Sequence, residues 1–149
     1  MKSLIGWLII SVFPMGSTKI ISLKKVAKGT SISYGRTFVC KKESLIATLP
    51  IGYADGYKRS LSNKGEVLIR ERKVPIVGVV CMDLVMLDVT GVPGVSLGDG
   101  AVLMGSQGDK KITAEEIAER TGTISYEVLC GISPRVPRVY LKKGKVLSN

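Results

Sequence analysis

The segment that decides the fold is SISYGRTFVCKKESLIATLPIGYADGYKR, residues 31–59. Its first nine residues alternate between two faces and predict a strand with Ile32, Tyr34 and Arg36 on the same side. Tyr34 and Tyr53 each adjoin a glycine, which leaves open space beside the backbone for an aromatic side chain. The segment therefore predicts β structure in which polar side chains are presented beside apolar strands.

Outward from this segment, the chain predicts one domain that is mainly β. At 149 residues and 45% hydrophobic composition it is long enough for a single core, and its 17 glycines favour a turn-rich fold. About eight short strands are expected, which suggests a small β-barrel or β-sandwich. Besides 31–39, the expected strands are 18–30, 44–53, 66–70, 73–82, 84–90, 100–108, 123–132 and 135–141.

A single short helix is expected near residues 113–121. Thr113 and Glu116 have the spacing of an N-terminal capping box, and Gly122 stands where a left-handed C-cap belongs. These signals are local, so they predict the helix and both of its ends.

Charge and cysteine content limit the classes of function. The net charge is +10, which suits nucleic acid, membrane headgroups or small anions, but no block of five like charges occurs. One Trp, five Tyr and two Phe leave few platforms for base stacking, so nucleic acid is not expected as a partner. A membrane partner is not expected either. The three cysteines show no C-x-x-C spacing, and reduced thiols fit a cytoplasmic protein. No histidine is present, which excludes a Ser-His-Asp mechanism and imidazole metal ligands within this chain.

The first 14 residues, MKSLIGWLIISVFP, form an apolar run after Lys2. The run resembles a short signal-peptide core, but it is too short to span a bilayer and no A-x-A cleavage site follows. We expect residues 1–17 to be an apolar remnant, with residues 18–149 as the β-domain.

Five ordered segments together resemble one family. They are ISYGRT (32–37), GYADGYKRSLSNKG (52–65), PIVGVVCMD (75–83), GTISYEVLCGIS (122–133) and RVPRVY (135–140). In this order and spacing they are similar to the C-terminal β-domain of pyridoxal-phosphate-dependent alanine racemases, over roughly residues 18–141.

The resemblance implies an enzyme assembled from two kinds of domain. In that family a (β/α)-barrel domain carries the lysine that binds pyridoxal 5'-phosphate, and two subunits pair head-to-tail. The β-domain of one subunit completes the site on the barrel of the other. The family's roles imply Tyr34 as catalytic acid/base, Met82, Tyr53, Arg59 and Asp83 at the substrate site or its entrance, and Tyr126 beside the cofactor phosphate.

The chemistry of racemisation asks for these residue types. One base must remove the α-proton on one face and a second group must return it on the other, with the cofactor as electron sink. A free tyrosine has a pKa of ~10 and needs a cation or charged partner to act near neutral pH. Arg36 alternates with Tyr34 and could be that cation, although the sequence leaves this open.

Two departures from the family qualify the prediction. Val79 stands where the family usually has an arginine in G-R-V-C-M-D, so a cation near the substrate entrance is missing. No segment resembles the lysine-bearing motif, so we expect a truncated or separately encoded β-domain that is inactive alone. The alternatives are a non-catalytic interaction module and a nucleic-acid-binding β-barrel.

Overall fold

The computed structural model describes residues 8–9, 16–142 and 145–146. The predicted N-terminal remnant lies outside these residues except at 8–9 and 16–17. Among the described residues, no helix has the length and apolar character needed to cross a membrane.

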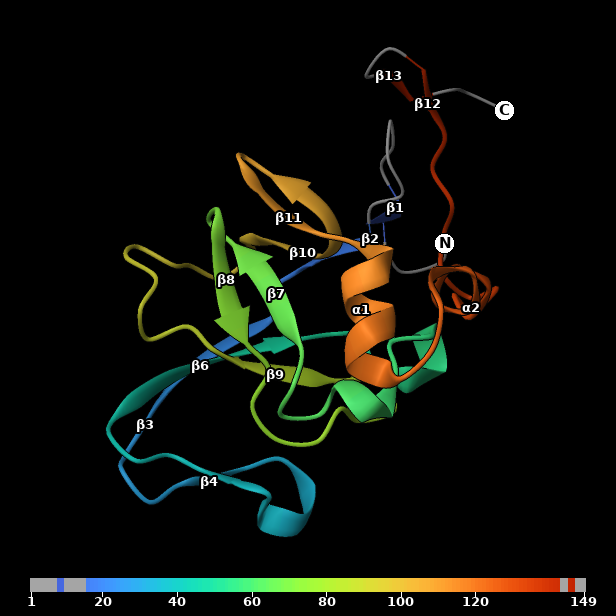
Figure 1. Ribbon diagram of the computed structural model, residues 1–149. Helices are drawn as coiled ribbons and strands as arrows, with labels where there is room; N and C mark the ends of the chain where they lie inside the picture. The colour runs from blue at the N-terminus through green and yellow to red at the C-terminus, as the bar shows by residue number, and fades with distance from the viewer. Residues whose placement is uncertain (1–7, 10–15, 143–144, 147–149) are drawn as a thin grey trace.

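The largest sheet has six strands and joins distant parts of the chain (Figure 1). All of its pairings are antiparallel, and β11 forms a hairpin with the C-terminal part of β10, from Gly105 to Gln107. In spatial order its strands are β1 (Leu8–Ile9), β2 (Gly16–Lys19), β10 (Gly100–Gln107), β7 (Glu66–Ile69) and β8 (Arg72–Pro75), with β11 (Lys110–Ile112) beside β10.

A second antiparallel sheet consists of β3 (Ser22–Val26), β6 (Ser44–Leu49) and β9 (Val85–Asp88). An antiparallel bridge between Ile76 and Leu87 connects the chain after β8 to β9. The remaining strands form two small ribbons, β4 (Ser31–Ile32) with β5 (Phe38–Val39) and β12 (Leu141–Lys142) with β13 (Lys145–Val146).

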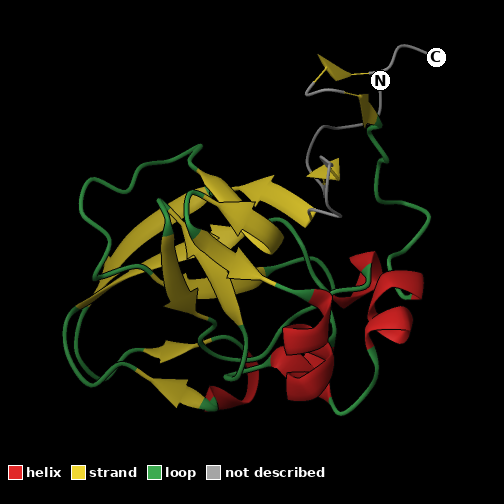
Figure 2. Cartoon of the chain, turned by 45° about the horizontal axis from the view of Figure 1, so that its top comes forward, coloured by secondary structure: helices red, strands yellow, loops and turns green. Residues whose placement is uncertain are grey.

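The core lies between these sheets and the helices. Inward-facing residues of β6, β7, β9 and β10 are fully buried, and they include Leu49, Leu68, Leu87 and Leu103. The prediction of a mainly β domain is confirmed, although the sheets of the described chain form no closed barrel. Figure 2 shows the helices α1 and α2 at one end of the strands.

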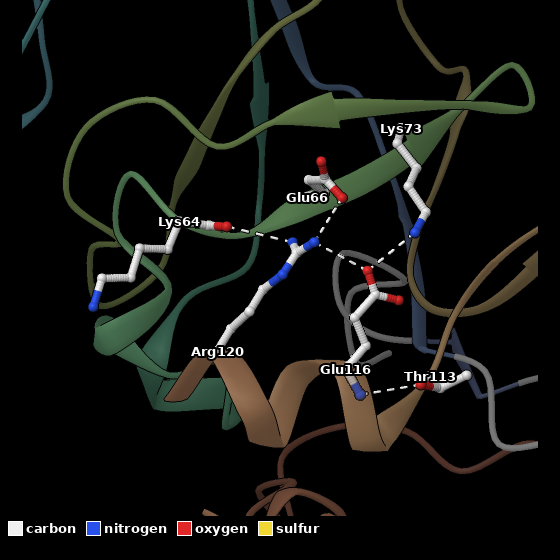
Figure 3. A network of polar contacts seen from close by, with 6 residues as sticks. All are labelled: Lys64, Glu66, Lys73, Thr113, Glu116 and Arg120. Carbon is white, nitrogen blue, oxygen red and sulfur yellow. Dashed lines mark hydrogen bonds and ion pairs between the residues drawn. The ribbon is translucent and has the colours of Figure 1, made fainter. Parts of the chain in front are cut away.

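Helix α1 (Ala114–Thr121) confirms the helix prediction. The Thr113 side chain accepts a hydrogen bond from the Glu116 N–H at 3.0 Å, and Gly122 ends the helix with φ of 70°. Arg120 then attaches the helix to β7, because its guanidinium contacts both Glu66 and Glu116 (Figure 3).

Three of the predicted strands differ from the structure. Residues 135–140 form no strand, because β12 begins only at Leu141. Residues 123–132 contain helix α2 (Ser125–Cys130), whose Val128 packs into the main core beside α1. A short apolar run does not distinguish a strand from a helix, and here packing against α1 favours the helix.

The predicted strand at residues 31–39 is interrupted by a turn. A 3-10 turn at Tyr34–Arg36 separates β4 from β5, with φ of 71° at Gly35 and 53° at Arg36. Tyr34 and Arg36 therefore do not share one face of a strand, because the backbone reverses between them.

Candidate functional site

One surface hollow brings together five of the six residues predicted for the site. It has a volume of about 480 Å³, and Tyr34 and Tyr53 expose 75% and 47% of their surface beside it. The hollow lies between the turn after β4, the segment after β6 and the loop before β9. Its lining residues are Tyr34, Tyr53, Arg59, Val79, Val80, Cys81, Met82, Asp83 and Leu84.

The turn that carries Tyr34 is fixed against the loop before β9. The Ser33 hydroxyl donates to the Val79 carbonyl at 2.8 Å and lies 3.4 Å from the Cys81 sulfur. Gly78 permits this approach, because a Cβ there would lie 2.7 Å from both the Ile32 carbonyl oxygen and the Ser33 Cβ. The Tyr34 phenol is thus held at the rim of the hollow by contacts of its neighbours.

Tyr53 begins a second 3-10 turn, Tyr53–Asp55, that packs directly on the loop before β9. The backbone N–H groups of Tyr53 and Ala54 donate to the carbonyls of Cys81 and Met82, at 3.0 and 3.1 Å. Gly52 lies so close to both carbonyls that a side chain there would overlap them. These contacts fix the two carbonyls on either side of the Met82 N–H.

The sequence reasoning missed the ion pairs that hold this corner together. Arg135 donates from Nε to Asp55 Oδ1 at 2.6 Å and from its terminal nitrogen to Asp83. Asp55 is only 5% exposed, and its other oxygen accepts the Gly52 N–H at 2.9 Å. Hydrogen bonds to Asp55 and then Asp83 raise the pKa of Arg135, so the arginine is charged at any physiological pH. Arg135 is the first residue of the RVPRVY segment, and the presence of this segment in the sequence was the one sign that Arg135 belongs to the site.

Tyr126 stands apart from the other predicted residues. It lies on α2, is 75% exposed, and does not line the hollow. A neighbouring ion pair from Lys58 to Glu127, 2.9 Å long, links α2 to the segment that carries Tyr53. Any ligand that contacts both Tyr34 and Tyr126 must therefore extend beyond the hollow itself.

The described residues include acidic side chains and three cysteines as potential metal ligands. They contain no group of three or more histidine, cysteine or acidic side chains placed to hold an ion. The cysteines Cys40, Cys81 and Cys130 are all free thiols. What the hollow offers is two phenols, one guanidinium, a carboxylate and backbone groups, a set suited to binding a small charged molecule and moving a proton.

Comparison with known proteins gives a consistent result along the chain. A family model described as "Alanine racemase, C-terminal domain" matches residues 15–140. The chain is 60% identical over 126 residues to the alanine racemase of Halothermothrix orenii, covering 85% of this chain and 33% of that protein. It is also 60% identical over 129 residues to alanine racemase 2 of Caldanaerobacter subterraneus subsp. tengcongensis, covering 87% and 33%.

Solved structures of similar shape carry the same description. The alanine racemase of Bacillus anthracis with bound L-Ala-P superimposes with a TM-score of 0.85 and 45% identity, covering 93% of this chain and 36% of that one. The Clostridium difficile 630 alanine racemase in complex with cycloserine gives a TM-score of 0.82 and 40% identity, covering 90% and 35%. The chain thus spans about one third of the length of the curated relatives it matches.

Proposed function

The chain belongs to the alanine racemase family as its C-terminal domain, and we propose that it supplies the tyrosine acid/base of an enzyme that interconverts L- and D-alanine. The observation that carries the proposal is the convergence of Tyr34, Tyr53, Arg59, Met82 and Asp83 on one open hollow. These residues come from three separate segments of the chain, and nothing in the spacing between those segments requires them to meet.

In this proposal Tyr34 transfers a proton at the α-carbon of the amino acid. Its phenol is exposed at the rim of the hollow, where a substrate presented from outside can reach it. The Met82 N–H donates a hydrogen bond to the substrate carboxylate. Tyr53, Arg59 and Asp83 line the entrance through which the substrate reaches it. Arg59 favours an anionic group near the hollow by its charge.

This chain could contribute to binding pyridoxal 5'-phosphate at the phosphate group, but the lysine that holds the cofactor belongs to another domain. The exposed phenol of Tyr126 is available to donate a hydrogen bond to a phosphate held by another domain. In the described part of the chain no lysine lines the hollow, and in this proposal the lysine that binds the cofactor belongs to the barrel domain. When bound, the cofactor supplies the electron sink that makes the α-proton removable. We therefore expect the chain alone to be inactive.

The expected partners follow from the assignment of the tyrosines to this chain and of the cofactor lysine to another domain. We propose a barrel domain and a second subunit as protein partners, a small amino acid as substrate, and a cytoplasmic location in keeping with three free cysteines. A nucleic-acid-binding or non-catalytic interaction module is not favoured, because identity to alanine racemases extends over more than four fifths of the chain.

The experiment joins this chain to the lysine-bearing barrel domain of a relative and measures alanine racemisation. We expect activity from the joined protein and none from the chain alone. Tyr34→Phe should reduce the turnover number by about 100-fold or more, the usual size of an acid/base contribution.

Tyr140→Phe is the matched control, because Tyr140 is 65% exposed and lies outside the hollow. It should leave turnover unchanged. Equal turnover in the Tyr34→Phe protein and in the joined wild type would overturn the role of Tyr34, and racemisation by the isolated chain would overturn the need for a barrel.

A further inference from the structure

We propose that Arg135 is a positioning residue that fixes the Met82 peptide and neutralises the charge of Asp83 beside it. The inference rests on the proposed function, in which the Met82 N–H receives a carboxylate. It concerns a side chain that does not itself line the hollow and was not among the predicted site residues.

The first observation is that Arg135 joins two separate segments. One of its nitrogens contacts buried Asp55 in the turn after β6, and another contacts exposed Asp83 in the loop before β9. Arg135 is in turn held by its own loop, since the Ser133 hydroxyl accepts its backbone N–H at 3.3 Å and the Ser133 N–H donates to the Asp55 carbonyl at 3.0 Å. A planar guanidinium can bridge two carboxylates in this way, whereas the compact ammonium of lysine cannot match its geometry.

The second observation concerns the peptide between these contacts. The carbonyls of Cys81 and Met82 are both bound by the turn that Asp55 closes, and Asp83 follows directly. The Met82 N–H donates to no group in the described part of the chain, although its two flanking carbonyls are engaged. The N–H is therefore fixed in direction and available to a ligand of the hollow that Met82 lines.

The third observation is one of charge. Asp83 is next to the residue that receives the substrate carboxylate, and two negative groups so close repel each other. The Arg135 guanidinium contacts the Asp83 carboxylate and offsets that repulsion. Arg135 thus has two effects on the hollow, one on the direction of a backbone donor and one on the local potential.

The first test uses the chain as it stands. Backbone hydrogen exchange of Tyr53 and Ala54, whose N–H groups donate to the carbonyls of Cys81 and Met82, is compared by NMR in the wild type, Arg135→Gln and Arg120→Gln. Arg120 is the matched control, because it also bridges two carboxylates, Glu66 and Glu116, in a network away from the hollow (Figure 3). We expect exchange at the two amides to rise about tenfold or more in Arg135→Gln alone. If Arg135→Gln does not fold, Arg135→Lys replaces it, with a smaller rise at the same amides.

The second test uses the chain joined to a barrel domain. Arg135→Gln should raise KM for alanine about tenfold and change kcat by less than about threefold. Adding Asp83→Asn to Arg135→Gln removes the negative charge that the arginine no longer pairs. It should bring the raised KM part of the way back to the wild-type value, a coupling that a merely structural role would not produce.

The outcomes separate this inference from the proposed function. Unchanged exchange at Tyr53 and Ala54 in Arg135→Gln, or equal changes in Arg120→Gln, would overturn the inference whether or not the joined protein is active. In the joined protein, equal changes of kcat and KM in Arg135→Gln and Arg120→Gln would also overturn it, provided that adding Asp83→Asn does not lower the raised KM. Altered exchange at the two amides in a joined protein without activity would support the positioning role and count against the proposed function instead.

Discussion

Gly52 is the position where the smallest substitution should most disturb the hollow. A Cβ in Gly52→Ala would overlap the Cys81 carbonyl oxygen and lie 2.5 Å from the Met82 carbonyl carbon, inside the 3.0 Å that real Cβ contacts keep. The φ of Gly52 is −163°, which any residue adopts, so the cost is steric and not conformational. The Cβ would lie 2.0 Å from the Cys81 oxygen, so the turn and the loop before β9 must move apart by about 1 Å to reach 3.0 Å.

The magnitude follows from the contacts that the movement disturbs. Two backbone hydrogen bonds, from Tyr53 to Cys81 and from Ala54 to Met82, would lengthen or break, at about 1 kcal/mol each. Overpacking of a close backbone contact adds about 1–3 kcal/mol. We expect Gly52→Ala to lower the free energy of unfolding by about 3–5 kcal/mol, a large part of the 5–15 kcal/mol typical of a domain.

Urea unfolding followed by circular dichroism measures this loss. Gly91→Ala is the control, because Gly91 has nothing within 4 Å of its Cβ position and no positive φ. It should change the free energy of unfolding by less than about 0.5 kcal/mol. A loss below about 1 kcal/mol in Gly52→Ala would refute the reasoning, because the loop would then tolerate a side chain where the structure leaves no space.

Three further predictions concern stability. Leu87→Ala, at a fully buried position of β9, should lower the free energy of unfolding by about 2–5 kcal/mol, and a urea midpoint close to that of the wild type would contradict the assigned core. Thr113→Ala removes the cap of α1 and should cost about 1 kcal/mol, seen as a melting temperature about 2–4 °C lower, whereas Thr113→Ser should keep the cap and melt near the wild type. Burial raises the pKa of Tyr57, so the unfolded chain loses that proton first and the wild type should lose up to about 1.4 kcal/mol of stability per pH unit above about pH 10. Alkaline urea titrations of Tyr57→Phe should lack this component, and identical pH dependence in both proteins would count against it.

The sequence predicted those features whose causes are local. The α1 helix was predicted with both ends because Thr113 caps it and Gly122 ends it, each within one turn of the helix. The strand predicted at 44–53 is shorter in the structure: β6 ends at Leu49, directly before Pro50, because proline cannot continue the ladder.

The features that were missed depend on contacts between distant residues. The sequence predicts a strand at α2 because a short run such as Ser125–Cys130 fits either element, and only its packing on α1 favours a helix. The positive φ at Ser33, Gly35 and Arg36 breaks the predicted alternation, and Gly35 was the one local signal for it. The contact from Arg135 to Asp55 joins residues 80 positions apart, which no local pattern can reveal.

The most direct test of the central claim measures proton exchange from each enantiomer of alanine separately. The chain is joined to a lysine-bearing barrel domain, and loss of the α-proton to deuterated solvent is followed by NMR for L-alanine and D-alanine. In Tyr34→Phe, exchange from one enantiomer should fall by about 100-fold or more while exchange from the other stays within about tenfold of the wild type, because Tyr34 serves one face of the α-carbon. Equal exchange from both enantiomers in Tyr34→Phe and in the wild type would contradict the assignment of Tyr34 as the proton-transferring group of this domain.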